Sequence, residues 1–267
     1  MRIKYLYKDG KKKALTMSYD DCSTEDRRLV ELFNKYHIKG TFHLISGQME
    51  NDWRVKLEEI PTLYAGHEVS CHSLTHPFFD QIPKEELLYE MLEDKKRLEA
   101  ACGYPVRGMS YPNGIVNEDV LTCLKACGFV YARTAGSSEN FKLPEDFMQW
   151  TGTCHHSHDI IGKIEQFRTA YYALPLFYIW GHSFELPRNT ANNSWAMMEE
   201  FCDKFTATFE DSVWYATNIE IYDYVTALRR VSLSADRTMI YNPSAETLWF
   251  EVDGAPVEIK SGLTKLK

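Results

Sequence analysis

The chain has 267 residues, which is enough for one large domain or for one domain with a small appendage. Its residues are 44% hydrophobic and 25% charged, values typical of a globular protein, which excludes a disordered or collagen-like chain. With 30 basic and 38 acidic residues the net charge is −8, so no overall positive field is available to attract nucleic acid or an anionic membrane.

Strand-like and helix-like segments alternate along the first 230 residues. Apolar β-type runs predict strands, and apolar residues that recur every three or four positions predict helices. In chain order the predicted strands are 14–19, 41–45, 68–71, 106–111, 129–133, 176–180 and 213–216. The predicted helices are 23–37, 52–63, 83–102, 117–128, 159–173, 194–209 and 219–230. About seven β-then-α units in series indicate an α/β fold with a parallel sheet, and their number favours closure into a barrel.

The pattern changes after Arg230. Short strands are predicted at 231–234, 239–241, 248–252 and 257–260, separated by turn residues such as Asn242-Pro243 and Asp253-Gly254. We therefore predict two parts. Residues 1–230 form the barrel, and residues 231–267 form a small antiparallel β-appendage packed on it.

Three features favour a cytoplasmic protein. The longest nearly apolar stretch, residues 170–180, falls short of the roughly 20 residues that cross a bilayer. The N-terminal segment is interrupted by charges and lacks the apolar run of a secretory signal. The seven cysteines are scattered without a CxxC pair, as is typical of reduced and mostly buried thiols. We expect neither a membrane nor a nucleic acid as partner.

Polar side chains gather where the predicted strands end. The segments are Asp20-Asp21, His72 to His76, Tyr111 to Gly114, and His182. In parallel α/β barrels the reactive groups come from these strand ends. Each piece has an ordinary interpretation, since paired aspartates often cap a turn and single histidines often pack in a core. Together, one carboxylate and two imidazoles suit a catalytic zinc ion with an open position for water, beside a second carboxylate able to accept a proton.

Other motifs are weaker or absent. His67 and Glu68 with His72 approach the HExxH zinc motif, but the second histidine comes one residue late. The sequence contains no GxSxG elbow, GxGxxG fingerprint or phosphate loop. A rival metal cluster is His155, His156 and His158, whose ordinary interpretation is polar residues near a helix start or along the same cleft.

These residues, in this order, resemble the polysaccharide deacetylase family, which has the NodB-homology domain of carbohydrate esterase family 4. The similar motifs are Ser18-Tyr19-Asp20-Asp21, His72-Ser73-Leu74-Thr75-His76, Arg107 with Tyr111-Pro112-Asn113-Gly114, and the late His182. The resemblance spans roughly residues 13–228. It implies a distorted (β/α)7 barrel and a metal-dependent hydrolase that removes acetyl groups, mostly from N-acetylated sugars.

The resemblance also implies roles for individual residues. Asp20 would be the general base, oriented by Arg107, and His182 the general acid. The backbone N–H of Asn113 would face the oxyanion. The metal ligands would be Asp21, His72 and His76, holding Zn²⁺ or another divalent transition metal. The residues expected to contact a carbohydrate or small amide substrate are Tyr111, Pro112, Trp150 and Trp180.

Three departures from the family pattern concern the substrate more than the reaction. The fourth motif carries Gln149 before its tryptophan where the family has an aspartate that orients the acid histidine. We expect Asp146 to replace it, because Glu185 follows so soon after His182 that its side chain should point away. Trp180 stands where a leucine lines the acetyl pocket, which suggests a smaller or reshaped pocket. The third motif has extra residues between Arg107 and its proline.

Two other functions stay open. One is hydrolysis of a cyclic amide, an imide or ureide, on the same barrel. The other is a catalytically silent carbohydrate-binding barrel that retains the aromatic residues Trp150, Trp180 and Trp195. Loss of the base or of a metal ligand would be the sign of a silent barrel, and the sequence retains both. The sequence does not indicate an oligomeric state.

Overall fold

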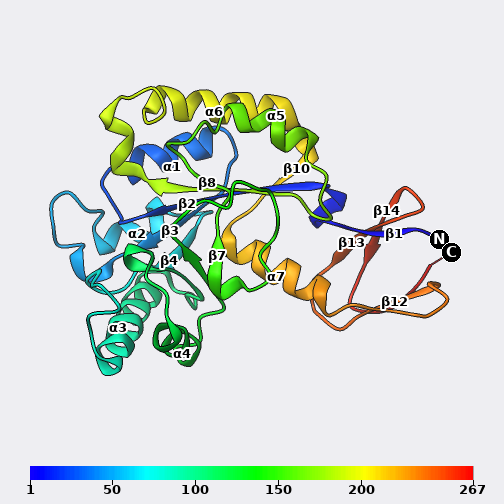
Figure 1. The fold of residues 1–267 in the computed structure, drawn as a ribbon, viewed down its shortest axis with the longest axis horizontal. Coiled ribbons are helices and arrows are strands. Elements are labelled where there is room, and N and C mark those ends of the chain that lie inside the picture. The colour runs from blue at the N-terminus through cyan, green and yellow to red at the C-terminus, as the bar shows by residue number, and fades with distance from the viewer. Residues whose placement is uncertain (267) are drawn as a thin grey trace.

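A parallel sheet curls around the centre of the molecule in the computed structural model, which describes residues 1–266 (Figure 1). In hydrogen-bonded order its strands are β7 (Trp150–Thr151), β6 (Tyr131–Thr134), β5 (Gly108–Ser110), β4 (Glu68–Cys71), β3 (Gly40–Leu44), β2 (Lys13–Asp20), β9 (Leu176–His182) and β8 (Cys154–His155). A further strand, β10 (Val213–Tyr215), pairs in parallel with the first half of β2. Every neighbouring pair in this sheet is parallel, as the alternating sequence pattern predicts.

The chain itself closes this sheet into a ring. The two end strands, β7 and β8, are separated only by Gly152 and Thr153. One short segment thus passes from pairing with β6 to pairing with β9. The bend requires close approach, since a Cβ atom on Gly152 would lie 3.0 Å from the Trp180 ring. Counted as one bent strand, β7 and β8 complete a seven-membered ring, which confirms the distorted (β/α)7 barrel.

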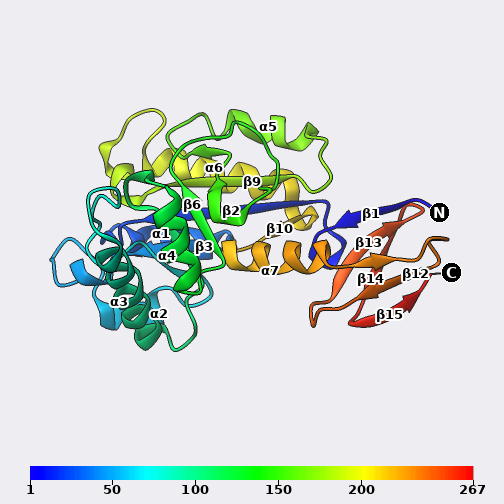
Figure 2. The same ribbon diagram turned by 60° about the horizontal axis from the view of Figure 1, so that its bottom comes forward.

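Helices cover the outside of the ring (Figures 1 and 2). They are α1 (Asp26–Lys35), α2 (Ile60–Leu63), α3 (Lys84–Cys102), α4 (Glu118–Ala126), α5 (Gly162–Thr169), α6 (Trp195–Phe209) and α7 (Asn218–Arg229). Three of them begin at side chains that cap the first turn, namely Asn117, Ser194 and Thr217. The predicted helix 52–63 starts later than expected, with a 3₁₀ turn at Leu57–Glu59 that continues into α2. Residues 53–55 instead run alongside the segment after β2, where the Val55 N–H donates to the Cys22 carbonyl.

Two clusters of buried apolar side chains hold these layers together. The larger lies between the sheet and helices α1 and α3 to α6. The smaller fills the barrel around Tyr131, Trp150 and Tyr178 and continues through α7 into the C-terminal strands. The second cluster therefore joins the barrel to its appendage.

The appendage consists of two small antiparallel sheets at one end of the molecule, beside both termini (Figures 1 and 2). One contains β1 (Ile3–Leu6), β13 (Leu248–Val252) and β14 (Ala255–Ile259), and the other β11 (Ser232–Leu233), β12 (Met239–Asn242) and β15 (Gly262–Lys265). The predicted boundary at residue 230 is wrong in one respect. The N-terminal strand β1 pairs with β13 and belongs to the appendage, because only the tertiary fold brings the chain ends together.

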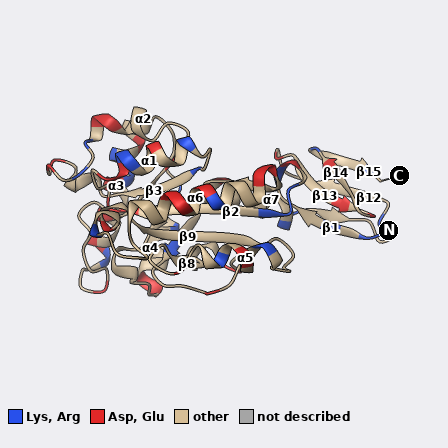
Figure 3. Ribbon diagram, turned by 90° about the horizontal axis from the view of Figure 1, so that it is seen from above, with Lys and Arg blue, Asp and Glu red and all other residues tan. Residues whose placement is uncertain are grey.

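Three further expectations concern the whole chain. No helix within residues 1–266 is long and apolar enough to cross a bilayer. The seven cysteines are free, and all but Cys102 are buried, as predicted for packed thiols. Acidic and basic positions are mixed along the helices and strands (Figure 3), in agreement with the absence of an overall basic field.

Candidate active site

The candidate residues meet at one rim of the barrel because the strands are parallel. Asp20 is the last residue of β2 and His182 the last of β9, and the two lie opposite each other in register. His72 comes directly after β4, the strand next to β3 in the ring. The strand-end rule thus predicts correctly that these side chains share one edge.

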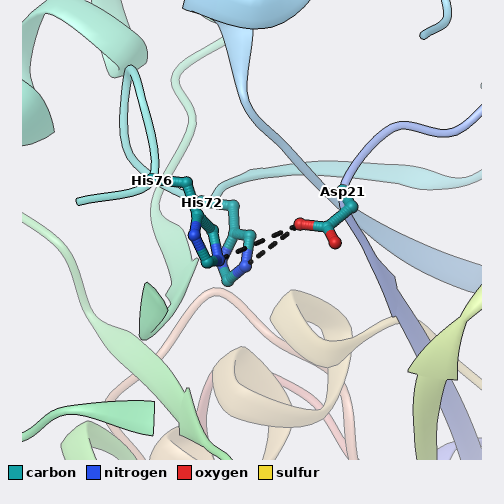
Figure 4. A group of neighbouring side chains, drawn as sticks. All are labelled: Asp21, His72 and His76. Atoms are coloured by element: carbon teal, nitrogen blue, oxygen red, sulfur yellow. Dashed lines mark ion pairs between the residues drawn. The ribbon is translucent and has the colours of Figure 1, made fainter. Parts of the chain in front are cut away.

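Asp21, His72 and His76 form a compact group (Figure 4). The Oδ1 atom of Asp21 lies 3.6 Å from Nε2 of His72 and 4.0 Å from Nε2 of His76. This oxygen is buried and has no hydrogen-bond partner within residues 1–266. A buried carboxylate oxygen that faces two imidazole nitrogens without a hydrogen bond fits a divalent transition metal ion, so the residues present suit the expected ligand set.

The surroundings of His72 prepare it to act as a ligand. Its Nδ1 lies 2.9 Å from the carbonyl oxygen of Ser110, which can only accept a hydrogen bond. Nδ1 therefore carries the proton, and the lone pair of Nε2 faces Asp21. Burial lowers the pKa of His72 to about 4, despite the opposing effect of Asp20 and Asp21, so the ring is neutral as metal binding requires.

Asp20 is a buried carboxylate held by two donors. Its Oδ2 accepts a hydrogen bond from Nη2 of Arg133, and its Oδ1 accepts one from the Ser110 hydroxyl at 3.2 Å. Burial by itself would raise the pKa of Asp20, but the Arg133 guanidinium and then the His72 ring outweigh it and hold this pKa well below its usual range. The carboxylate is therefore ionised and its position is fixed.

The expected role of Arg107 is wrong. Arg107 immediately precedes β5, so it lies at the amino end of the barrel, away from the rim that carries Asp20. Its Nη1 donates to Asp223 of α7 at 3.0 Å. Arg133, near the carboxyl end of β6, contacts Asp20 instead. The signal that could have found Arg133 is its place at the end of a predicted strand.

His182 has Glu185 as its acidic neighbour, which corrects the expectation of Asp146. The 3₁₀ helix Ser183–Arg188 turns the chain back after β9, and Oε2 of Glu185 lies 3.8 Å from Nδ1 of His182. Asp146 instead caps a short helix through the N–H of Met148. Burial opposes the charged ring, but Glu185 and then Asp20 outweigh it and raise the pKa of His182 above its usual value.

The expected substrate-contact residues divide into buried and accessible ones. Trp150 is only 1% exposed and packs against aromatic rings inside the barrel, so its expected contact with substrate is wrong. Tyr111 and Pro112 are also buried, and the Tyr111 hydroxyl donates to the Met148 carbonyl at 2.6 Å. Their expected contact with substrate stays a prediction. Trp150 was misassigned because side chains of a β-strand alternate between two faces, and the sequence does not show which face meets the rim.

Trp180 and Asn113 remain partly open to solvent. The Trp180 indole stacks on Arg133, 4.4 Å from the guanidinium carbon, and its Nε1 donates to the Gly136 carbonyl at 2.8 Å. Asn113 is exposed, with a φ of 55° in the left-handed region that Asn tolerates better than most residues. The expected role of its N–H at an oxyanion stays a prediction.

The comparisons with known proteins agree with this geometry. Residues 7–132 match the family model for polysaccharide deacetylase. This confirms the resemblance to the polysaccharide deacetylase family. The family match ends in β6, so it includes Asp20, Asp21, His72 and His76 but not His182.

Two curated relatives are both peptidoglycan-N-acetylglucosamine deacetylases. The chain is 29% identical over 114 residues to the peptidoglycan-N-acetylglucosamine deacetylase PgdA of Listeria monocytogenes, which covers 42% of this chain and 24% of the relative. It is 26% identical over 120 residues to a peptidoglycan-N-acetylglucosamine deacetylase of Bacillus cereus, which covers 44% of this chain and 54% of the relative. The chain thus matches about half or less of each relative's length.

Solved structures support the fold over most of the chain. A putative polysaccharide deacetylase from Mycobacterium smegmatis aligns over 85% of this chain and 94% of its own, with a TM-score of 0.60 and 17% identity. The Xyl-CE4 domain of a multidomain xylanase from the hindgut metagenome of Trinervitermes trinervoides aligns over 81% and 92%, with a TM-score of 0.55 and 16% identity. At these identities the likeness establishes the fold alone.

The metal-ligand assignment predicts a specific loss of bound ion. Replacing both His72 and His76 with Ala should lower the divalent metal bound per chain by about one ion, because two of three protein ligands are removed. His37→Asn is the matched control, since His37 is exposed and its φ of 55° suits Asn. Elemental analysis after saturation with Zn²⁺ and desalting measures both. Unchanged metal in the double variant would contradict the assignment.

Proposed function

We propose that this chain is a metal-dependent hydrolase that removes acyl groups, chiefly acetyl, from N- or O-acetylated carbohydrate. The observation that carries the proposal is one rim with three distinct parts. Asp20 is an ionised carboxylate, Asp21 with His72 and His76 is a candidate metal site, and His182 is a histidine of raised pKa. These are the parts that attack on an amide by water requires. The activity for which the curated relatives are named, deacetylation of peptidoglycan N-acetylglucosamine, supports a carbohydrate substrate.

The metal site would provide the electrophile. A Zn²⁺ ion, or another divalent transition metal, bound by Asp21, His72 and His76 would polarise the acyl carbonyl and make a nearby water more acidic. Asp20 is placed beside this site, with its Oδ2 3.8 Å from Nε2 of His72. It accepts the proton from the attacking water. Arg133 holds Asp20 in the ionised state and fixes its direction.

Two further groups complete the reaction. The backbone N–H of Asn113, a solvent-exposed residue, would donate to the oxyanion that forms when water adds to the carbonyl. His182 then donates its proton to the leaving amine nitrogen, and Glu185 favours the charged ring before this step. Glu185 acts through His182 and is therefore a positioning residue.

The accessible tryptophan bears on the size of the acyl group. The Trp180 indole is held by Arg133 on one face and by a hydrogen bond to Gly136, so it cannot easily move to admit a larger group. We propose that it forms one wall of a narrow acyl pocket suited to acetyl.

A substrate panel of N-acetylglucosamine oligomers, acetylated xylan and a cyclic ureide tests the proposed substrate class. Turnover of the ureide alone would favour the cyclic-amide alternative.

Asp20→Asn should separate chemistry from metal binding. The amide keeps the size of the side chain but cannot accept the proton, so turnover should fall by about a hundredfold or more. Bound metal should stay within error of the wild type. Asp21→Asn is the matched variant next in the chain, and it should weaken metal binding as well as turnover. Metal loss in Asp20→Asn but not in Asp21→Asn would show that the two roles are reversed.

The two arginines provide a direct test of the structural correction. Arg133→Met should reduce turnover by at least about tenfold, because Asp20 loses the donor that keeps it ionised and oriented. Arg107→Met keeps the same change in side chain but removes only a half-exposed ion pair with Asp223, so turnover should change by less than about threefold. Circular dichroism checks that both variants fold. The reverse order of effects would restore the role first expected for Arg107.

His182→Ala tests the general acid. An amide leaves as an amine that must be protonated, whereas an activated ester such as a nitrophenyl acetate has a leaving group that needs no proton. The variant should therefore lose turnover sharply on an N-acetylated sugar and much less on the activated ester. Equal losses on the two substrates would make His182 a residue that positions substrate rather than an acid.

A further inference from the structure

A second cluster of metal-type ligands lies at the same rim of the barrel. His155 ends β8, His156 follows it, and Glu185 lies in the 3₁₀ helix after β9. Oε2 of Glu185 is 3.2 Å from Nε2 of His155 and 3.2 Å from Nε2 of His156. We propose that these three residues bind a second divalent transition metal ion, separate from the one assigned to Asp21.

The spacing of the three atoms supports this proposal. Metal–ligand bonds of about 2.0–2.2 Å in a tetrahedral zinc site place neighbouring ligand atoms about 3.3–3.6 Å apart. The two nitrogen–oxygen separations of 3.2 Å are close to the lower end of that range. In the Asp21 group the corresponding separations are 3.6 and 4.0 Å. The second cluster therefore needs less rearrangement than the first to surround an ion.

The charge of Glu185 provides a second, independent argument for an ion at this cluster. Oε2 of Glu185 is buried and accepts a hydrogen bond from no group within residues 1–266, although two ring nitrogens lie 3.2 Å away. The other oxygen, Oε1, accepts one from Arg188 at 3.1 Å. A buried anionic oxygen without a donor is costly, and a cation between it and the two rings removes that cost.

The neighbours of the two rings fix their positions and leave the proton of each neutral ring on Nε2, so an ion would have to replace these protons. Nδ1 of His155 lies 2.8 Å from the Ser157 hydroxyl, and the Ser157 N–H also donates to it at 3.2 Å. Nε2 of His156 lies 3.1 Å from the Asn193 side-chain oxygen, which accepts a hydrogen bond from the ring. Gly181 allows the close approach, since a Cβ atom there would lie 2.2 Å from His156.

The ligand set also indicates the class of ion. Two imidazoles and one carboxylate favour zinc or a similar transition metal over magnesium or calcium, which prefer oxygen ligands. The ion would tie the end of β8 to the turn after β9. Because Glu185 lies 3.8 Å from His182, the ion would also restrict the turn that directly follows the acid histidine. This positioning role rests on the proposed function, whereas the ion site does not.

Metal stoichiometry tests the second site without any assay of activity. The full chain is stripped with chelator, saturated with Zn²⁺ alone, desalted and analysed for metal. The wild type should hold about two ions, and His155→Ala and Glu185→Gln about one each, because each change removes one of only three protein ligands. His158→Ala is the matched control, since His158 lies outside the cluster and pairs with Glu139. It should retain the wild-type content.

The alternatives give different results. The second site is overturned if the wild type holds one ion that is lost in the His72 and His76 double variant and kept in His155→Ala. That result leaves the proposed function intact. If instead the single ion is lost in His155→Ala and kept in the double variant, the second site stands and the proposed function fails. Saturation with Co²⁺ gives a spectral check, since visible absorption should fall by about half in His155→Ala relative to the wild type.

Discussion

The parallel direction of the barrel strands is the constraint on which the site depends. A parallel ring places all its strand ends at one rim, so residues far apart in the chain meet without any special loop. Asp20 and His182 are 162 positions apart, yet they are partners in register between β2 and β9. The ring is closed by the bend at Gly152 between β7 and β8, where the chain changes from one neighbour to the other.

Within that rim, the burial of charged groups carries the largest cost in free energy. Asp20 and Arg133 are both almost fully buried, and an ion pair removed from water contributes little net stability once the desolvation of both groups is counted. Its benefit lies in the proposed chemistry, because it keeps Asp20 ionised beside the candidate metal site. The same reasoning applies to Glu185, whose oxygen faces His155 and His156 without a hydrogen-bond donor. Unpaired buried oxygens at both clusters are where cations fit.

Each correction has its own local cause. Arg107 precedes β5 and Arg133 lies near the carboxyl end of β6, and only that end of a strand reaches the rim. The assignment to Arg107 followed the family motif rather than the position of the residue in its predicted strand. Glu185 was expected to point away from His182, and a single turn of 3₁₀ helix brings it back. Trp150 was expected to face substrate, and its strand directs it into the barrel interior instead.

The sequence by itself determined the alternation of strands and helices, the closure into a barrel, and the residues at the ends of the strands. These depend on local periodicity and on the direction of parallel strands, which are properties of short segments. The tertiary structure alone decided which arginine contacts Asp20, which carboxylate contacts His182, and that the N-terminal strand joins the appendage. Those pairings join segments distant in the chain or depend on one tight turn, and side-chain direction there follows from packing rather than from residue type.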